Sequence, residues 1–272
     1  MTALENSTSK QIHRRIWTIA WPMTLSSVST PLLGIVDTAL LGHLGAAHYL
    51  AAVAIGANFI GLLYWSFGFL RMGTTGQVAQ WFGQRRNNDA LAKTQIDAVL
   101  FRAMAVGLAL GLIIVVITPF ISVHVVSWMN ASATTAPLAE EYIDIRRYSA
   151  PLVFITFAIS GWLIGTQQPR RALAIIVLMN ALNIFFDLLF IVYFDMASAG
   201  AAWATLIAEA SAFVLGCYFL ARYSGALKTM LWPRWLNSTE LLAMLRVNYY
   251  LLVRTIILLS LIHISEPTRQ DR

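Results

Sequence analysis

The chain has 272 residues, of which 58% are hydrophobic and only 12% charged, and its mean hydropathy is +0.67. Soluble domains carry roughly 25% charged residues, so this composition excludes a secreted domain, a disordered chain and a conventional soluble enzyme, and it predicts an integral membrane protein. The net charge of +6 lies in short basic clusters between apolar runs, which is typical of cytoplasmic loops and not of a nucleic-acid-binding face.

Six apolar runs have the length that a bilayer-spanning helix needs, about 20 residues. They lie near residues 16–41, 50–70, 96–122, 148–166, 172–194 and 200–221. Because the runs are continuous and not alternating, they predict an all-α bundle of six transmembrane helices and exclude barrel strands. In the third run, Gly107 and Gly111 form a GxxxG pattern, which predicts close helix packing.

The basic residues predict the orientation of the bundle. One set of loops carries Lys10, Arg14, Arg15, Arg85, Arg86, Lys93, Arg170, Arg171, Arg222, Lys228 and Arg234. The opposite set carries Glu140, Glu141, Asp144 and Asp195, with Arg146 and Arg147 as exceptions at the start of a helix. By the positive-inside rule, the N-terminus is cytoplasmic in a multi-pass protein of the inner or plasma membrane.

Three polar residues fall at one depth in the predicted bundle. Asp37 and Asp187 lie near the outer ends of the first and fifth helices, and Thr205 lies near the outer start of the sixth. A rise of 1.5 Å per residue places them about 6–10 Å below the outer surface. A charge at bilayer depth costs about 2.5–3.5 kcal/mol, so this coincidence predicts a shared polar site.

Asn180, Asn183 and Asp187 have the spacing i, i+3, i+7, which places them on one face of the fifth helix. Carboxylate, amide and hydroxyl oxygens can together bind a cation, although interhelical hydrogen bonding, worth about 0.6 kcal/mol per contact, is an alternative. Glu209 lies one turn beyond Thr205 and either lines the same cavity or pairs with a neighbouring helix.

Other polar features have structural or functional readings that the sequence leaves open. Pro22 and Pro31 allow the first helix to bend, and Arg71 is expected near the cytoplasmic end of the second helix, where its side chain can reach water. Enzyme motifs are missing from the sequence. An intramembrane aspartyl protease using Asp37 and Asp187 is a remaining alternative, although such proteases usually show Tyr-Asp and Gly-x-Gly-Asp.

Several motifs resemble the multidrug and toxic compound extrusion (MATE) family. They are Pro31-Leu-Leu-Gly-Ile-Val-Asp37-Thr-Ala-Leu-Leu-Gly-His43, Leu70-Arg-Met-Gly-Thr-Thr-Gly76, Gly161-Trp-Leu-Ile-Gly165, Asn183-Ile-Phe-Phe-Asp187 and Gly200-Ala-Ala-Trp-Ala-Thr205. The resemblance implies a cation-coupled antiporter that exports organic cations, drugs or other amphipathic toxins, with twelve helices in two lobes that open alternately to either side.

The resemblance also implies roles for individual residues. Asp37 would take part in proton or sodium coupling, Asn183 and Asp187 would form the cation site of the N-terminal lobe, and Thr205 would support it. Pro22 matches the proline at which the first helix bends. No cofactor is expected beyond H⁺ or Na⁺ as the coupling ion, and no metal site other than sodium at these residues.

The sequence predicts one lobe of such a transporter. Residues 1–15 would be a cytoplasmic N-terminus, 16–222 the six-helix lobe, and 223–246 an interfacial connector. Residues 247–258 would begin a seventh helix, and 259–272 resemble a translated sequencing adapter and are expected to be non-native. The missing C-terminal lobe would then be a partner, besides a small-molecule substrate and the lipid bilayer. A self-pairing half-transporter and a lipid-linked oligosaccharide flippase are the alternatives.

Overall fold

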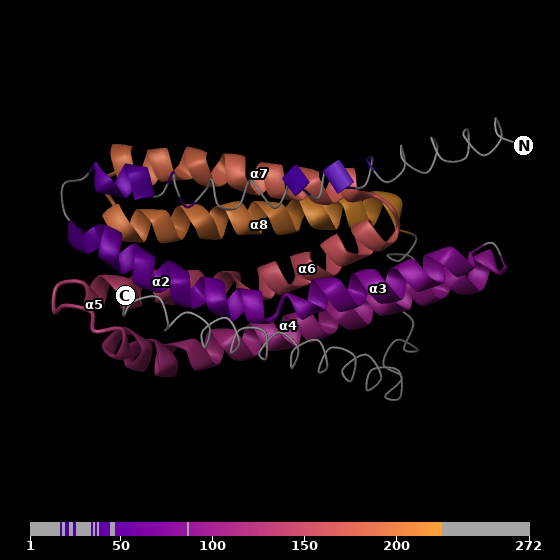
Figure 1. The fold of residues 1–272 in the computed structure, drawn as a ribbon, viewed down its shortest axis with the longest axis horizontal. Helices are drawn as coiled ribbons and strands as arrows, with labels where there is room; N and C mark the ends of the chain where they lie inside the picture. The colour runs from indigo at the N-terminus through magenta and orange to yellow at the C-terminus, as the bar shows by residue number, and fades with distance from the viewer. Residues whose placement is uncertain are drawn as a thin grey trace, which may run out of the picture.

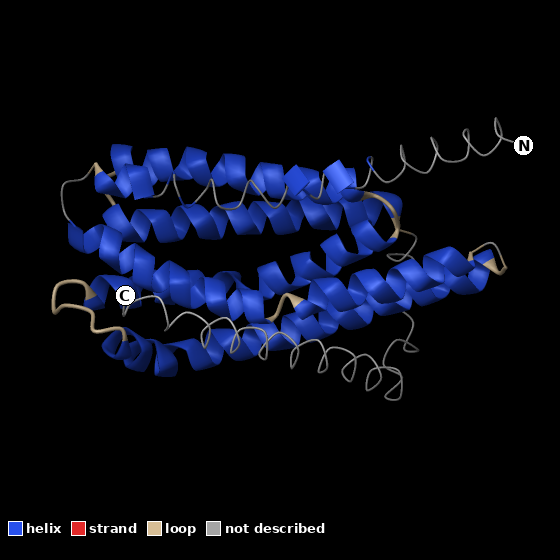
Figure 2. Cartoon of the chain, viewed as in Figure 1, coloured by secondary structure: helices blue, strands red, loops and turns tan. Residues whose placement is uncertain are grey.

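The structure, a computed structural model, describes residues 17, 20, 21, 24, 25, 34, 36, 38–43, 47–85 and 87–224. These residues form helices joined by short loops, with no strand among them (Figure 2). Five of the described helical segments are long and apolar enough to cross a membrane. The predicted all-α membrane class is therefore confirmed. The count of six is not tested, because the first predicted helix is described only in part.

Each candidate span consists of one or more helical elements. In chain order these are α2 (Ala47–Ser66), α3 (Phe69–Gln84), α4 (Asp89–Trp128), α5 (Ala136–Arg146), the 3-10 turn η1 (Arg147–Ser149), α6 (Ala150–Gly165), α7 (Pro169–Asp187), the π-helical segment η2 (Leu188–Tyr193) and α8 (Ala197–Tyr223). The spans are Ala47–Gln84, Asp89–Trp128, Ala136–Gly165, Pro169–Tyr193 and Ala197–Tyr223.

The second predicted helix, 50–70, is longer in the structure. α2 and α3 make one span of 38 residues that continues to Gln84. From Thr74 onward α3 contains two threonines and three glutamines, which end the apolar run in the sequence. Packing sustains the helix there, because α3 lies against α4 and α6 and buries Thr74 and Val78. The Thr74 hydroxyl donates to the carbonyl of Leu70 at 2.7 Å and so needs no other partner.

The helix predicted at residues 148–166 begins earlier in the structure, within the segment of Glu140, Glu141 and Asp144 that was assigned to the outer loops. α5 begins at Ala136 and leads through η1 into α6. Its buried positions, Ala139, Tyr142, Ile143 and Arg146, follow the 3–4-residue spacing of an amphipathic helix. The carboxylates of Glu141 and Asp144 lie on the exposed side. The high charge of this segment hid its helical periodicity.

Glycines allow α4 and α6 to approach closely, as the GxxxG pattern predicts. A Cβ atom at Gly111 would lie 2.4 Å from Cα of Pro151, and one at Gly107 would lie 3.0 Å from the backbone of Phe154. On its other side, α6 meets α3, where a Cβ atom at Gly161 would lie 2.7 Å from the Arg71 carbonyl oxygen. The prediction of close packing is confirmed, and α6 is a central helix of the described bundle.

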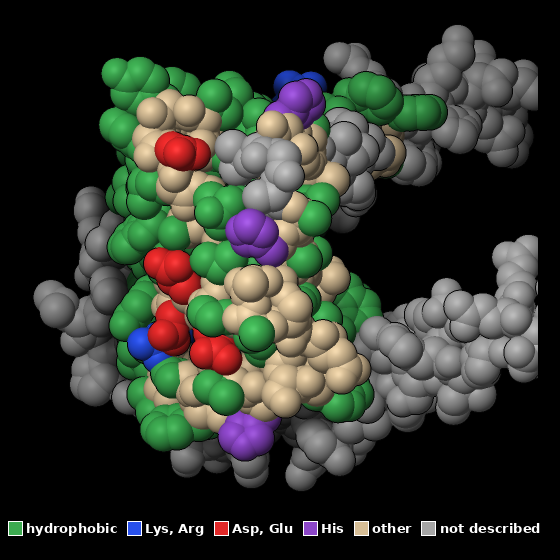
Figure 3. Space-filling view, turned by 90° about the vertical axis from the view of Figure 1, so that its left-hand side faces the viewer, with side chains coloured by type: hydrophobic (Ala, Val, Ile, Leu, Met, Phe, Trp, Pro, Cys, Tyr) green, Lys and Arg blue, Asp and Glu red, His purple; other side chains and the backbone are tan. Residues whose placement is uncertain are grey.

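The helices run roughly parallel to one long axis, with α7 beside α8 and α3 beside α4 (Figure 1). Acidic side chains gather on one end of the molecule (Figure 3). The exposed carboxylates of the loops and helix ends there are Glu141, Asp144 and Asp195. The opposite connections carry the exposed basic residues Lys93, Arg170 and Arg222. This asymmetry agrees with the charge pattern on which the orientation was predicted.

Candidate cation site

The predicted polar face of α7 is buried in the bundle. Asn183 and Asp187 have no exposed surface, and Asn180 is 8% exposed. α8 packs along α7, and its first turns carry the buried small residues Ala201 and Ala204, which leave room for the polar side chains of α7. The sequence therefore places two amides and a carboxylate in the interior, as its spacing predicts.

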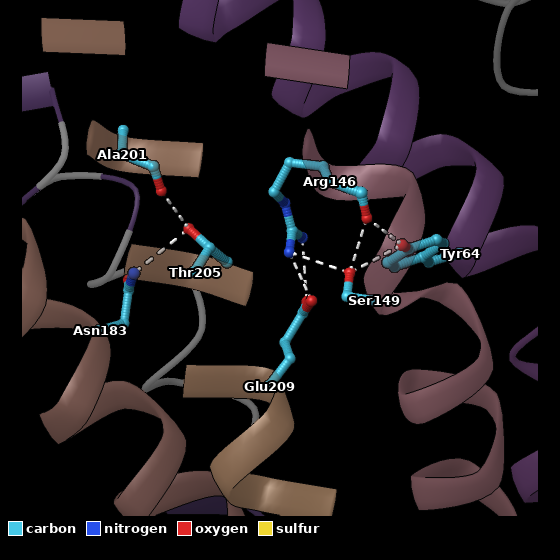
Figure 4. A network of polar contacts seen from close by, with 7 residues as sticks. All are labelled: Tyr64, Arg146, Ser149, Asn183, Ala201, Thr205 and Glu209. Carbon is cyan, nitrogen blue, oxygen red and sulfur yellow. Dashed lines mark hydrogen bonds and ion pairs between the residues drawn. The ribbon is translucent and has the colours of Figure 1, made fainter. Parts of the chain in front are cut away.

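Asn183 and Thr205 meet across the two helices. The Asn183 Nδ2 group donates a hydrogen bond to Thr205 Oγ1 at 3.2 Å, and the Thr205 hydroxyl donates to the Ala201 carbonyl at 2.8 Å (Figure 4). The sequence places Thr205 at the depth of Asp187 and Asn183 on the same helix face as Asp187, and this hydrogen bond joins Asn183 to Thr205 across 22 positions. With its proton used on Ala201, the Thr205 oxygen can only accept further contacts.

The two amide side chains of this face have acceptor oxygens without a hydrogen-bond donor in the described part of the chain. Among those residues nothing donates to the buried Asn183 Oδ1, and neither polar atom of the buried Asn180 side chain has a partner. Leaving a buried polar group unsatisfied costs about 1–3 kcal/mol. Buried oxygens of this kind suit a small hard cation, which prefers carboxylate, amide and hydroxyl ligands.

Asp187 occupies a special position in the backbone. It is the last residue of α7, and the π-helical segment η2 follows it directly. π-helical turns are rare and occur frequently at functional sites. A buried carboxylate also needs a compensating charge or hydrogen bonds to be tolerated. Both features point to Asp187 as the charged member of the cluster formed by Asn180, Asn183, Asp187 and Thr205, which we call the α7–α8 cluster.

A second polar network lies on the other side of α8. The Arg146 guanidinium binds both carboxylate oxygens of Glu209, through Nη2 at 2.9 Å from Oε1 and through Nη1 to Oε2. Arg146 and Glu209 are 7% and 12% exposed. Nη1 also donates to Ser149 Oγ at 3.2 Å, and the Tyr64 hydroxyl lies 2.9 Å from the same oxygen and donates to the Arg146 carbonyl at 3.0 Å (Figure 4).

The network settles the role of Glu209 among the alternatives that its sequence position allows. Its carboxylate pairs with a neighbouring helix, α5, and does not join the α7–α8 cluster. Sequence reasoning missed Arg146, because it was taken for a basic residue at the start of a helix. The useful signal was its spacing from Ala139 and Tyr142, which places it on the buried face of α5.

Three other predicted features lie elsewhere. Pro22 and Asp37 fall outside the described residues. Arg71 was expected near the cytoplasmic end of its helix, which is wrong, because the span continues from Arg71 to Gln84. Its side chain lies near the start of α3 and is exposed, with its guanidinium 5.8 Å from the ring centroid of Phe157. Within the described ranges no group of three or more His, Cys, Asp or Glu side chains gathers to hold a metal ion. Any cation bound there would therefore depend on amide and hydroxyl oxygens besides carboxylates.

The sequence was compared with protein families and curated proteins. Residues 22–189 match the family model described as MatE. DNA damage-inducible protein F of Escherichia coli (strain K12) is 35% identical over 250 residues, which cover 90% of this chain and 52% of that protein. Multidrug export protein MepA of Staphylococcus saprophyticus is 24% identical over 205 residues, which cover 74% of this chain and 44% of that protein.

Solved structures share the fold. A structure described as the outward-facing conformation of a multidrug resistance MATE family transporter superposes with a TM-score of 0.69 and 25% identity, covering 78% of this chain and 45% of that chain. A MOP superfamily transporter from Pyrococcus furiosus gives a TM-score of 0.67 at 26% identity, covering 76% and 44%. The chain thus spans about half the length of the relatives that it matches.

Proposed function

The chain belongs to the MatE family, whose members are membrane transporters, and from that premise we propose that it is the N-terminal lobe of a cation-coupled antiporter. The exported substrates would be organic cations, drugs or other amphipathic toxins, in keeping with the multidrug export that the names of MepA and of the structural neighbour describe. A second lobe would enclose the substrate together with this one.

The main support for a coupling site is the α7–α8 cluster. It combines a fully buried carboxylate, Asp187, with the donor-free amide oxygen of Asn183 and the hydroxyl oxygen of Thr205. In the proposed mechanism Asp187 accepts a proton or binds Na⁺, and the two other oxygens complete the coordination. Asp37 would join them from the first helix, as the family resemblance implies.

Cation binding can drive transport only through its different affinity for the two conformations of the lobe. A bound cation would neutralise the buried carboxylate and stabilise the conformation that releases substrate outside. Bending of the first helix at Pro22 would be the accompanying motion. The lobe would lie in the inner or plasma membrane with its N-terminus in the cytoplasm. The basic ends of α3, α4 and α7 would face the same side.

Binding measurements test the coupling site directly. The purified 272-residue chain in lipid nanodiscs is titrated with Na⁺ in choline buffer by calorimetry, and its proton uptake is followed with a pH indicator in Na⁺-free solution. We expect Asp187→Asn to abolish binding of the coupling cation. Thr118→Val is the matched control, because Thr118 is a buried polar residue of α4 whose hydroxyl bonds only within its own helix, and this variant should bind as the wild type does.

Transport provides the second readout. Vesicles that contain the full-length protein, in which this lobe is joined to the second lobe, are loaded with ethidium, and an inward Na⁺ or proton gradient is imposed. Gradient-driven efflux should occur with the wild type and with Thr118→Val, and should be lost with Asp187→Asn. Cation binding by Asp187→Asn that equals the wild type, or efflux that needs no cation gradient, contradicts the proposal.

A further inference from the structure

Burying the Arg146–Glu209 ion pair inside a membrane bundle has a large desolvation cost. Taking two charges out of water costs several kcal/mol per ion, and apolar residues of similar size often give equal or greater stability. The pair nevertheless has close bidentate geometry and additional contacts to Ser149 and Tyr64. Stability alone therefore does not account for a charge pair at this position.

The pair lies beside the proposed cation site. Glu209 follows Thr205 by four residues on α8, which is about one turn and a rise of about 6 Å. In Figure 4 the Thr205 side chain meets Asn183 on one side of α8, while the Glu209 side chain extends to Arg146 on the other. The two polar centres thus share one helix and are separated by a single turn.

A single uncompensated charge one helical turn away along α8 would change the affinity of the site for a cation. In the low-dielectric interior, a unit charge about 10 Å from a bound cation changes its affinity by on the order of tenfold at an effective dielectric constant of about 20. The ion pair is neutral as a whole, and its field on the site is much smaller. Besides Glu209, the titratable groups that act on Arg146 in the described part of the chain are Tyr64 on α2 and Tyr142 on its own helix, α5.

We infer that Arg146 compensates the charge of Glu209 and thereby sets the cation affinity of the α7–α8 cluster. The inference rests on the proposed cation site. Glu209 balances the Arg146 guanidinium, which would otherwise repel an incoming cation, and Arg146 balances the Glu209 carboxylate, which would otherwise hold the cation too firmly for release. The pair acts on cation affinity through its net charge and is not among the proposed ligands.

Charge and geometry can be separated by substitution. In Glu209→Gln the amide oxygen can still accept a hydrogen bond from Arg146, but the guanidinium charge is no longer balanced, because arginine stays protonated. We expect the dissociation constant for the coupling cation to rise about tenfold. In the double variant Arg146→Met with Glu209→Gln both charges are gone, and affinity should return to within about threefold of the wild type, since the net local charge is again zero.

Two further variants test whether charge or geometry of the pair determines the cation affinity. Arg146→Lys keeps the charge and loses the bidentate geometry, so it should bind the cation with wild-type affinity. Arg146→Met alone leaves Glu209 ionised or protonated, and its affinity should be equal to or above that of the wild type. This second single variant keeps the test decisive where Glu209→Gln does not fold, as judged by its helical circular dichroism and its elution as a single species.

The measurements are the Na⁺ titration and proton uptake described for the coupling site. A purely structural role predicts that every variant of the pair, including the double variant, loses affinity, and that result overturns the inference while the cation site stands. If the wild type binds neither Na⁺ nor protons, or Asp187→Asn binds as the wild type does, the proposed function falls and this inference falls with it.

Discussion

Two polar clusters that share α8 differ in which of their buried atoms lack a hydrogen-bond partner among the described residues. In the Arg146–Glu209 network both carboxylate oxygens and the Ser149 hydroxyl have hydrogen-bond partners, and the buried atom there that lacks one within the described residues is a donor, the Arg146 Nε group. In the α7–α8 cluster the atoms left over include acceptors, the amide oxygens of Asn180 and Asn183. Surplus acceptors favour a cation, whereas satisfied acceptors favour an internal structural contact.

The comparison explains why burial and charge alone do not identify a ligand site. Glu209 and Asp187 are both acidic, both buried or nearly so, and both lie in membrane-spanning helices. Glu209 pairs with an arginine on α5, and Asp187 shares the buried face of α7 with the amides of Asn180 and Asn183. The residue types on each helix face therefore differ between the two carboxylates.

Breaking the ion pair should have the largest effect on stability. Glu209→Leu leaves the buried guanidinium of Arg146 without its counter-charge, and removing one partner of a buried pair costs about 3–5 kcal/mol. We expect the free energy of unfolding to fall by that amount. The measurement is the loss of helical circular dichroism during titration of the chain with dodecyl sulfate in mixed micelles.

The companion double variant, Arg146→Met with Glu209→Leu, sharpens this prediction. Apolar replacement of a whole buried pair is often neutral, so its stability should lie within about 1 kcal/mol of the wild type, the scale of ordinary substitutions. Equal losses in the single and double variants would show that packing, and not the unpaired charge, governs the effect.

The α7–α8 cluster should respond in cation affinity more than in stability. Thr205→Val removes an acceptor of the Asn183 amide and a proposed ligand oxygen, a change of about 1–3 kcal/mol, or about tenfold to a hundredfold in the dissociation constant. Thr205→Ser keeps the hydroxyl and should bind as the wild type does. Unchanged Na⁺ and proton binding in Thr205→Val would leave the threonine with a purely structural hydrogen bond.

Depth and helical periodicity together pointed to the α7–α8 contact. Counting from the helix ends assigned Asp187 and Thr205 to one level, the i, i+3, i+7 spacing placed Asn183 on the same face as Asp187, and the structure joins Asn183 to Thr205 by a hydrogen bond. Such counting works here because a short loop joins the two helical segments and keeps the helix ends near one level. The close approach of α4 and α6 at Gly107 and Gly111 followed from the GxxxG pattern for a similar reason: it is a local property of one helix.

The Arg146–Glu209 pair could not be predicted in the same way. α5 is rich in charge, so its hydropathy places it outside the membrane, and its helical form depends on packing against α2 and α8. The partner of Glu209 lies 63 positions away, and several basic residues were possible from the sequence. Pairings between helices require the rotation of each helix about its axis, which neighbouring side chains fix together.

The Tyr64 hydroxyl provides the smallest test of the comparison. Tyr64→Phe removes the hydrogen bond to the Arg146 carbonyl and the contact with Ser149, while the ring keeps its edge-on packing against Phe154. A hydrogen bond of this kind contributes about 0.5–1.5 kcal/mol, and we expect that loss in the dodecyl sulfate titration. Cation affinity should stay at the wild-type value, because the charges of Arg146 and Glu209 remain balanced. A shift in Na⁺ or proton binding without a loss of stability would mean that the two clusters are coupled through geometry, and would contradict a separation based on charge.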